Sequence, residues 1–176
     1  MLRTINLKLF VVTLLMGLLS VSMLKAQERE KHELHSMMIY NFLKYIQWPE
    51  SANSGQFVIG VMGDDDVYNT LNSWYGDKER QGRVLRVKKI KSAAEASQCQ
   101  LIYIGRSWSN MFEAVQQSVN NNPTLVITDK NGLGHRGSGI NFKIVNNRLK
   151  FELNQNALNS SKLKVSSQLA AMAIVI

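Results

Sequence analysis

The stretch that decides the fold is Phe57-Val58-Ile59-Gly60-Val61-Met62-Gly63-Asp64-Asp65-Asp66. Its first six residues are apolar or small on both faces, which is typical of a strand that is buried on both sides in a parallel sheet. A glycine and three acids then stop the run, as expected where a strand leads into the N-terminus of a helix. Residues 101–107 and 124–129 repeat this pattern. The sequence therefore predicts an α/β domain.

Helical and extended periodicities alternate along the rest of the chain. The first helix should have a broad buried face and end at Trp48-Pro49. Its apolar stripe is Leu34, Met38, Phe42 and Tyr45, and Ile39, Leu43 and Ile46 widen it. We expect a single three-layer domain, in which helices flank a central, mostly parallel sheet and an antiparallel hairpin follows towards the C-terminus. The other expected elements are helices at residues 66–75 and 110–119, a short helix or turn at 92–99, a charged edge strand within 78–91, a hairpin of 140–144 with 149–153, and a tail, 160–176, that begins as a loop and closes with a helix.

The N-terminus has the pattern of an export signal. Met1 to Lys8 is basic, and Leu9 to Val21 is almost wholly apolar, as in the first two regions of a signal peptide. We expect residues 1–26 to be a signal peptide that is cleaved after Ala26, and residues 27–176 to be the mature domain. An uncleaved anchor is the alternative, but the apolar run is shorter than the ~20 residues of a membrane-spanning helix.

Charge and cysteine content narrow the classes of protein. The chain of 176 residues carries a net charge of +8, and loss of the signal peptide leaves 18 basic against 13 acidic residues. That balance permits attraction to an acidic partner, whereas export argues against a nucleic-acid partner. Cys99 is the only cysteine, so no intramolecular disulfide can form. We interpret it as a small buried apolar residue.

The acidic run Asp64-Asp65-Asp66 is a candidate ligand site. The carboxyl ends of parallel strands border the crevice where open α/β sheets bind ligands, and residues 105–109 and 129–137 should open at the same edge. The run could hold a divalent cation or accept a phosphoryl group. The alternative is that these acids only cap the following helix and interact with its dipole.

Other motifs do not support catalysis. Gly132–Gly137 matches the G-x-G-x-x-G spacing of dinucleotide-binding loops, but a strand rather than a helix should follow, so we interpret it as a plain loop. His32 and His35 could share a metal, yet no third ligand is evident and we expect two solvated polar residues. Ser138 lacks the G-x-S-x-G motif of a hydrolase nucleophile. We predict no catalytic residue, no cofactor and no metal.

Two segments could contact a protein partner. Trp108 and Arg106 follow a predicted strand, and both residue types are enriched at binding hot spots. Trp108 could instead pack on the helix that follows, and Trp74 is expected in the core. The basic segment 78–91 is either a docking patch or a solvated edge whose charges discourage pairing with other strands.

Six segments follow one another in a recognisable order: residues 39–49 (IYNFLKYIQWP), 57–65 (FVIGVMGDD), 99–104 (CQLIYI), 139–142 (GINF), 151–154 (FELN) and 163–169 (LKVSSQL). This ordered set resembles the YfiR-like family of exported bacterial proteins. The resemblance implies a periplasmic α/β domain, often dimeric, that restrains a membrane-anchored diguanylate cyclase or serves a histidine kinase, and so acts in cyclic-di-GMP signalling. In disulfide-bearing members a cysteine occupies the position of Cys99, but here its partners are missing, which leaves only an intermolecular bridge.

Together these observations predict a non-enzymatic periplasmic regulatory protein that binds the periplasmic part of a membrane signalling protein. The expected partner-binding residues are Asp64, Asp65, Arg106 and Trp108. We expect no nucleic-acid partner, and contact with a membrane only through the partner or an uncleaved leader. The rival hypothesis is a periplasmic domain that binds a small ligand or a cation in the acidic crevice. A hydrolase would be indicated by an activity that is lost on changing Asp64 or His135.

Overall fold

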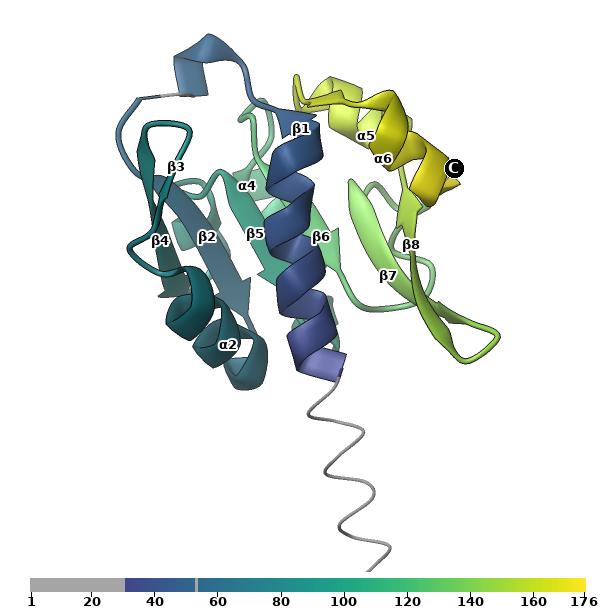
Figure 1. Ribbon diagram of the computed structural model, residues 1–176. Helices are drawn as coiled ribbons and strands as arrows, with labels where there is room; N and C mark the ends of the chain where they lie inside the picture. Colours follow the sequence, from purple (N-terminus) through teal and green to yellow (C-terminus); the bar gives the residue numbers. More distant parts are fainter. Residues whose placement is uncertain (1–30, 53) are drawn as a thin grey trace, which may run out of the picture.

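The computed structural model describes residues 31–52 and 54–176, and in this part of the chain an eight-stranded sheet forms the centre of the molecule (Figure 1). The predicted signal peptide, residues 1–26, lies outside the described residues. The strand order is β10-β8-β7-β6-β5-β2-β4-β3. The strands are β2 (Phe57–Met62), β3 (Glu79–Arg80), β4 (Arg83–Lys89), β5 (Leu101–Ile104), β6 (Leu125–Thr128), β7 (Ile140–Val145), β8 (Arg148–Leu153) and β10 (Ile174–Val175).

The decisive stretch forms β2, which lies between β4 and β5 and is parallel to both. Parallel pairing continues from β5 to β6 and from β6 to β7, and the predicted hairpin β7–β8 is antiparallel. Ile59, Val61 and Met62 are at most 2% exposed, because β2 is covered on both faces. The prediction of a mostly parallel α/β sheet with an antiparallel hairpin is confirmed.

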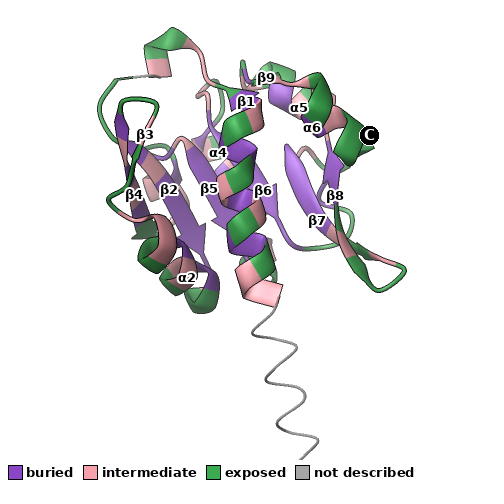
Figure 2. Cartoon of the chain, viewed as in Figure 1, coloured by how far each residue is buried: buried purple, intermediate pink, exposed green. Residues whose placement is uncertain are grey.

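Helices cover both faces of the sheet, and each face has its own apolar core. Figure 2 shows that the central strands of the sheet are mostly buried. The first core joins the N-terminal helix, residues 31–45, to α2 (Asp65–Tyr75), α5 (Gln155–Ser160) and α6 (Ser167–Met172). The second core lies under α3 (Ala93–Ala96) and α4 (Phe112–Ser118). The chain also forms two 3-10 helices, η1 (Glu50–Ala52) and η2 (Arg106–Met111). No helix in the described residues has the length and apolar character needed to cross a membrane.

The N-terminal helix buries most of the predicted broad face but not its first residue. Ile39, Phe42, Leu43 and Ile46 are at most 3% exposed, whereas Leu34 is 42% exposed. The helix also ends at residue 45, because β1 (Ile46–Gln47) pairs antiparallel with β9 (Lys164–Val165). That pairing joins segments more than a hundred residues apart, so local periodicity could not predict it.

One further prediction is confirmed with shifted bounds and two are corrected by the structure. The helix expected at residues 110–119 is α4, and the 3-10 helix η2, which contains a non-helical residue at Trp108 (φ −110°, ψ 20°), precedes it. The edge strand expected within residues 78–91 is β4, but β3 pairs with it on its outer side. Trp74 is only half-buried and belongs to neither core, because α2 turns Val67 and Leu71 towards the sheet.

The tail also differs from the expected loop and helix. It contains β9 and β10 in addition to α6. β10 pairs parallel with β8 and becomes the last strand of the sheet. The final helix packs through Leu169, which is 1% exposed.

Phe112 should dominate the stability of the second core, because it is 1% exposed in that cluster. We expect Phe112→Ala to lower the free energy of unfolding by about 3 to 5 kcal/mol through lost burial and a residual cavity. Ile144→Ala is the control, because Ile144 is 55% exposed, and it should change stability by less than about 0.5 kcal/mol. Urea denaturation followed by circular dichroism measures both, and equal effects would contradict this core.

Candidate functional site

The carboxyl ends of β2, β5 and β6 meet at one edge of the sheet, where the N-terminal helix begins (Figure 1). The loops after β2 and β5 approach closely: the Ser107 hydroxyl donates to the Gly63 carbonyl at 2.6 Å. A Cβ atom on Gly105 would lie 2.8 Å from that carbonyl oxygen, so the approach requires a glycine. These contacts fix the two loops relative to each other, and so they also fix the positions of the predicted strand-end residues.

Asp64 caps α2, as the alternative interpretation of the acidic run predicted. Its Oδ1 accepts from the Val67 amide at 3.0 Å, and its Oδ2 accepts from the Tyr103 hydroxyl at 3.4 Å. Burial raises the pKa of Asp64, and those two hydrogen bonds oppose the rise. Asp65 is different, since its side chain is 77% exposed and pairs with Lys89 at 2.9 Å.

His35 lies in the core beneath this edge, which corrects the prediction that it is solvated. It is 1% exposed, and its ring stacks on Phe142 at 4.3 Å between centroids and 5° between planes. Its Nδ1 is 3.2 Å from the Tyr103 hydroxyl, while its Nε2 has no hydrogen-bond partner in the described chain. The spacing of His35 from Ile39, one helical turn along the same face, was the signal that sequence reasoning missed.

The charge state of His35 follows from that burial. Desolvation lowers its pKa from 6.5 to about 4, and the positive charges of Lys31 and Arg106 reinforce the effect, although Asp129 opposes it. The imidazole is therefore neutral at neutral pH. A neutral ring keeps one nitrogen as a donor and one as an acceptor, so Nε2 can engage a ligand or water.

Asp129 is a residue of this site that the sequence did not single out. Its carboxylate accepts from Lys31 at 2.9 Å, and its side chain is only 7% exposed. Arg106 donates from Nε to the Asp129 carbonyl at 3.2 Å. These contacts tie the first helical turn to the loops after β5 and β6, and they join positions 98 residues apart in sequence.

A cavity of about 90 Å³ opens at this place. The unpartnered Nδ1 of His32 is also buried there, among the described residues. In residues 31–52 and 54–176 no three or more His, Cys, Asp or Glu side chains are grouped so as to hold a metal ion. The cavity is therefore suited to water or a small polar group. Its lining is Lys31, His32, His35, Asp64 and Asp66.

Trp108 stands beside this cavity in a larger open hollow of about 460 Å³, which Asp64 and Asp65 also line. Trp108 is 37% exposed and lies against Gly63, where an added Cβ atom would come within 2.4 Å of the indole Cγ. The structure thus brings three of the predicted partner-binding residues together. Arg106 does not line this hollow and turns to Asp129 instead.

The remaining sequence candidates have structural positions. Gly132–Gly137 forms turns between β6 and β7, so a strand follows it as predicted. Cys99 is 3% exposed, as expected of a small apolar residue, and burial raises its pKa to about 11. A thiol that is buried and protonated is poorly placed to form a disulfide with a second chain.

A buried polar network behind the site was also missed by sequence reasoning. The Thr128 hydroxyl donates to Asn141 at 2.7 Å, and Asn141 donates to Glu152 at 2.8 Å. Glu152 is 2% exposed; burial raises its pKa, but hydrogen bonds from Lys143 and Asn141 outweigh this and lower it overall. The network fixes the end of β6 against the β7–β8 hairpin.

The buried His35 should make the protein less stable in acid. The unfolded chain takes up a proton at this residue near pH 6.5 and the folded chain only near pH 4, so stability falls as the pH drops through that window. With about 1.4 kcal/mol for each pKa unit, the contribution of His35 is a loss of about 3 kcal/mol. We expect His35→Phe, which keeps a ring against Phe142, to lack this loss in urea denaturation between pH 7 and about 4.

A matched control separates this effect from other titrations. His135→Gln changes an exposed histidine and should keep the slope of the wild type. The pKa of Asp64 is raised in the folded state, so its protonation makes the folded protein more stable as the pH falls, which is opposite to the effect of His35. All variants keep Asp64, so this contribution is common to them. If His35→Phe and the wild type lose stability in parallel, the buried neutral imidazole is the wrong explanation.

Comparison with known proteins identifies the family. A search of curated proteins finds no match. A solved structure described as a conserved domain protein from Vibrio cholerae shares the fold, with a TM-score of 0.51 at 13% identity over 82% of this chain. The match covers 59% of that protein's length. The family model described as YfiR/HmsC-like (DUF4154) matches residues 32–174, and the chain therefore belongs to the YfiR/HmsC-like family.

Proposed function

We propose that the protein is a periplasmic regulator, which binds the periplasmic part of a membrane signalling protein of the diguanylate cyclase or histidine kinase type. The observation that carries the proposal is the family match over residues 32–174. Regulation would follow if the protein binds one state of its partner more tightly than another and so shifts the balance between them. Export by residues 1–26 and a homodimeric state are parts of the same proposal.

The surface assigned to the partner consists of Asp64, Asp65, Arg106 and Trp108, and we call it the strand-end surface. Three features support it. Trp108 and the side chain of Arg106 are 37% and 62% exposed, and both residue types are common at binding hot spots. The loop after β2, which carries the two acids, and the segment after β5, which carries Arg106 and Trp108, are joined by the Ser107 hydrogen bond. Little ordering of these segments is therefore needed on binding.

Trp108→Ala should weaken partner binding, because a tryptophan anchor at the centre of an interface contributes about 2 kcal/mol or more. The measurement is crosslinking in the envelope of intact cells, followed by mass spectrometry of the captured proteins. We expect the wild type to capture an inner-membrane protein that has a periplasmic sensory part and a cytoplasmic signalling domain. The variant should capture at least about tenfold less of it.

Trp74→Ala is the matched control, since Trp74 is a half-buried tryptophan on α2 outside the strand-end surface. It should capture as much partner as the wild type. Equal loss in both variants would assign the effect to folding, and capture of no inner-membrane signalling protein by the wild type would count against the proposed function itself.

A second function is favoured by the two buried ring nitrogens at the strand ends. His32 Nδ1 and His35 Nε2 have no partner among the described residues and border the 90 Å³ cavity beside Asp64 and Asp66. An unpaired buried nitrogen costs free energy, which a small polar ligand could recover. Within the alternative of a periplasmic small-ligand or cation-binding domain, this supports the small ligand.

Thermal denaturation separates the two functions. If the crevice binds a ligand, a member of a panel of Ca²⁺, Mg²⁺ and polar metabolites should raise the melting temperature in a saturable way. His35→Phe should remove that rise, and His135→Gln should keep it. If no member of the panel raises the melting temperature in a saturable way, the ligand-binding function is contradicted and the regulatory proposal stands alone.

A further inference from the structure

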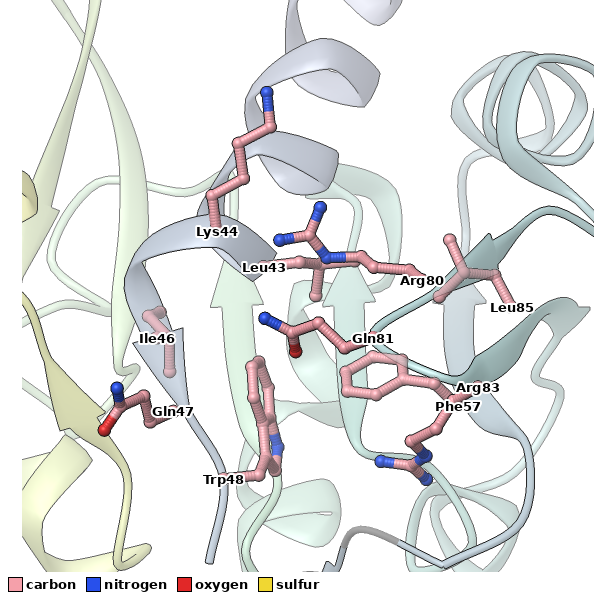
Figure 3. A pocket seen from close by; sticks show the side chains of 10 residues that line it. All are labelled: Leu43, Lys44, Ile46, Gln47, Trp48, Phe57, Arg80, Gln81, Arg83 and Leu85. Atoms are coloured by element: carbon pink, nitrogen blue, oxygen red, sulfur yellow. The ribbon is translucent and has the colours of Figure 1, made fainter.

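A second hollow, of about 400 Å³, lies at the opposite end of the sheet from the strand-end surface. It is formed where the N-terminal helix runs into β1, next to the β3–β4 hairpin and the start of β2 (Figure 3). Its volume is in the range of pockets that enclose small molecules. We call it the basic pocket. Its lining is Leu43, Lys44, Ile46, Gln47, Trp48, Phe57, Arg80, Gln81, Arg83 and Leu85.

The pocket wall carries positive charge without a compensating acid. Lys44, Arg80 and Arg83 line it, and no lining residue is acidic. None of the three forms an ion pair in the described part of the chain. Arg80 and Arg83 are also paired in register across the hairpin, where like charges repel. An anion in the pocket would relieve this repulsion.

Arg80 has unused capacity to bind such an anion. Its Nε is buried and has no hydrogen-bond partner among the described residues. One face of its guanidinium lies 5.5 Å from the centroid of the Tyr40 ring, which holds the group in place through a cation–π contact. A guanidinium presents a planar set of donors that fits a carboxylate or a phosphate.

Arg83 and the hairpin turn make the pocket preformed. The Arg83 guanidinium donates to the carbonyls of Ser54, Gly55 and Gln56 at 3.2, 3.0 and 2.7 Å. Gln81 and Gly82 join β3 to β4 with φ angles of 50° and 74°, as in a tight two-residue hairpin turn. Arg83 is thus bound to the main chain, which leaves Arg80 and Lys44 as the free cations of the lining.

The other side of the pocket carries two aromatic rings and Arg83. Figure 3 shows the Trp48 and Phe57 rings on the side away from Lys44 and Arg80, and the Arg83 guanidinium lies 5.1 Å from the centroid of the Phe57 ring. The two rings meet edge to face, with 4.9 Å between centroids and 87° between planes. Trp48 is held by its indole N–H, which donates to the Gln100 carbonyl at 3.1 Å. A rigid pair of rings suits a flat apolar body.

We propose that the basic pocket binds a small organic anion, in which a carboxylate or phosphate is attached to a flat apolar body. Arg80 and Lys44 bind the anionic group, and Trp48 and Phe57 contact the body. The site is separate from the strand-end surface, so it stands whether or not the regulatory function is correct. The ligand of the basic pocket is an anion, whereas the acidic crevice would bind a cation or another small ligand.

The test compares matched probes by isothermal titration calorimetry with the whole protein. The probes are 2-naphthoate, 2-naphthyl phosphate and the uncharged 2-naphthamide, which has the same ring and nearly the same shape as 2-naphthoate. We expect the anions to bind at least about tenfold more tightly than the amide. Comparison of the two anions shows whether the pocket prefers a carboxylate or a phosphate.

Variants assign the binding to the pocket. Arg80→Gln should weaken binding of the anions at least about tenfold and leave the amide unchanged. Lys44→Gln changes an exposed residue and should also weaken binding of the anions. This second variant tests the pocket even if Arg80→Gln disturbs the hairpin. Arg148→Gln removes an exposed arginine from β8 and should bind like the wild type.

Three results would overturn the proposal. The first is that neither anion binds at millimolar concentration. The second is that 2-naphthamide binds as tightly as 2-naphthoate, which would indicate an apolar site without anion recognition. The third is that folded Arg80→Gln and Lys44→Gln variants both keep wild-type affinity.

Discussion

Burial of β2 on both faces is the constraint on which the rest of the structure depends. A strand in that position needs neighbours on either side and a helical layer above and below, which β4, β5 and the two apolar cores supply. Parallel pairing then requires crossover connections, so the carboxyl ends of β2, β5 and β6 must lie at one edge. The candidate site exists because those ends are polar.

The chemistry of that edge is governed by low solvent access. His35, Tyr103 and Asp64 form a contiguous set, in which burial keeps the imidazole neutral and raises the pKa of both acids. Asp129 joins the set through Lys31 at the first helical turn. Interactions between such groups are stronger than at an open surface, because water screens them less. The N-terminal helix is therefore part of the site as well as of the core.

The two ends of the sheet differ in charge. The strand-end surface has two acids and an exposed tryptophan, and the small cavity beside it has two histidines, whereas the basic pocket has three cations and no acid in its lining. The N-terminal helix spans both, since Lys31 and His35 lie at one end and Leu43 and Lys44 at the other. A ligand in the pocket would thus touch the same helix that lines the small cavity at the other end of the sheet.

The sequence by itself determined β2, the parallel strands β5 and β6 and the β7–β8 hairpin, because each depends on local periodicity. It offered the capping role of Asp64 as one of two interpretations, and the hydrogen bond from the Val67 amide decided between them. Only the tertiary structure decided that β1 pairs with β9, that His35 is buried on Phe142, and that Lys31 meets Asp129. The same is true of the position of the β3–β4 hairpin, with Arg80 and Arg83, beside Trp48. These contacts join segments far apart in the chain, and pairing of that kind is set by the packing of whole elements rather than by local sequence.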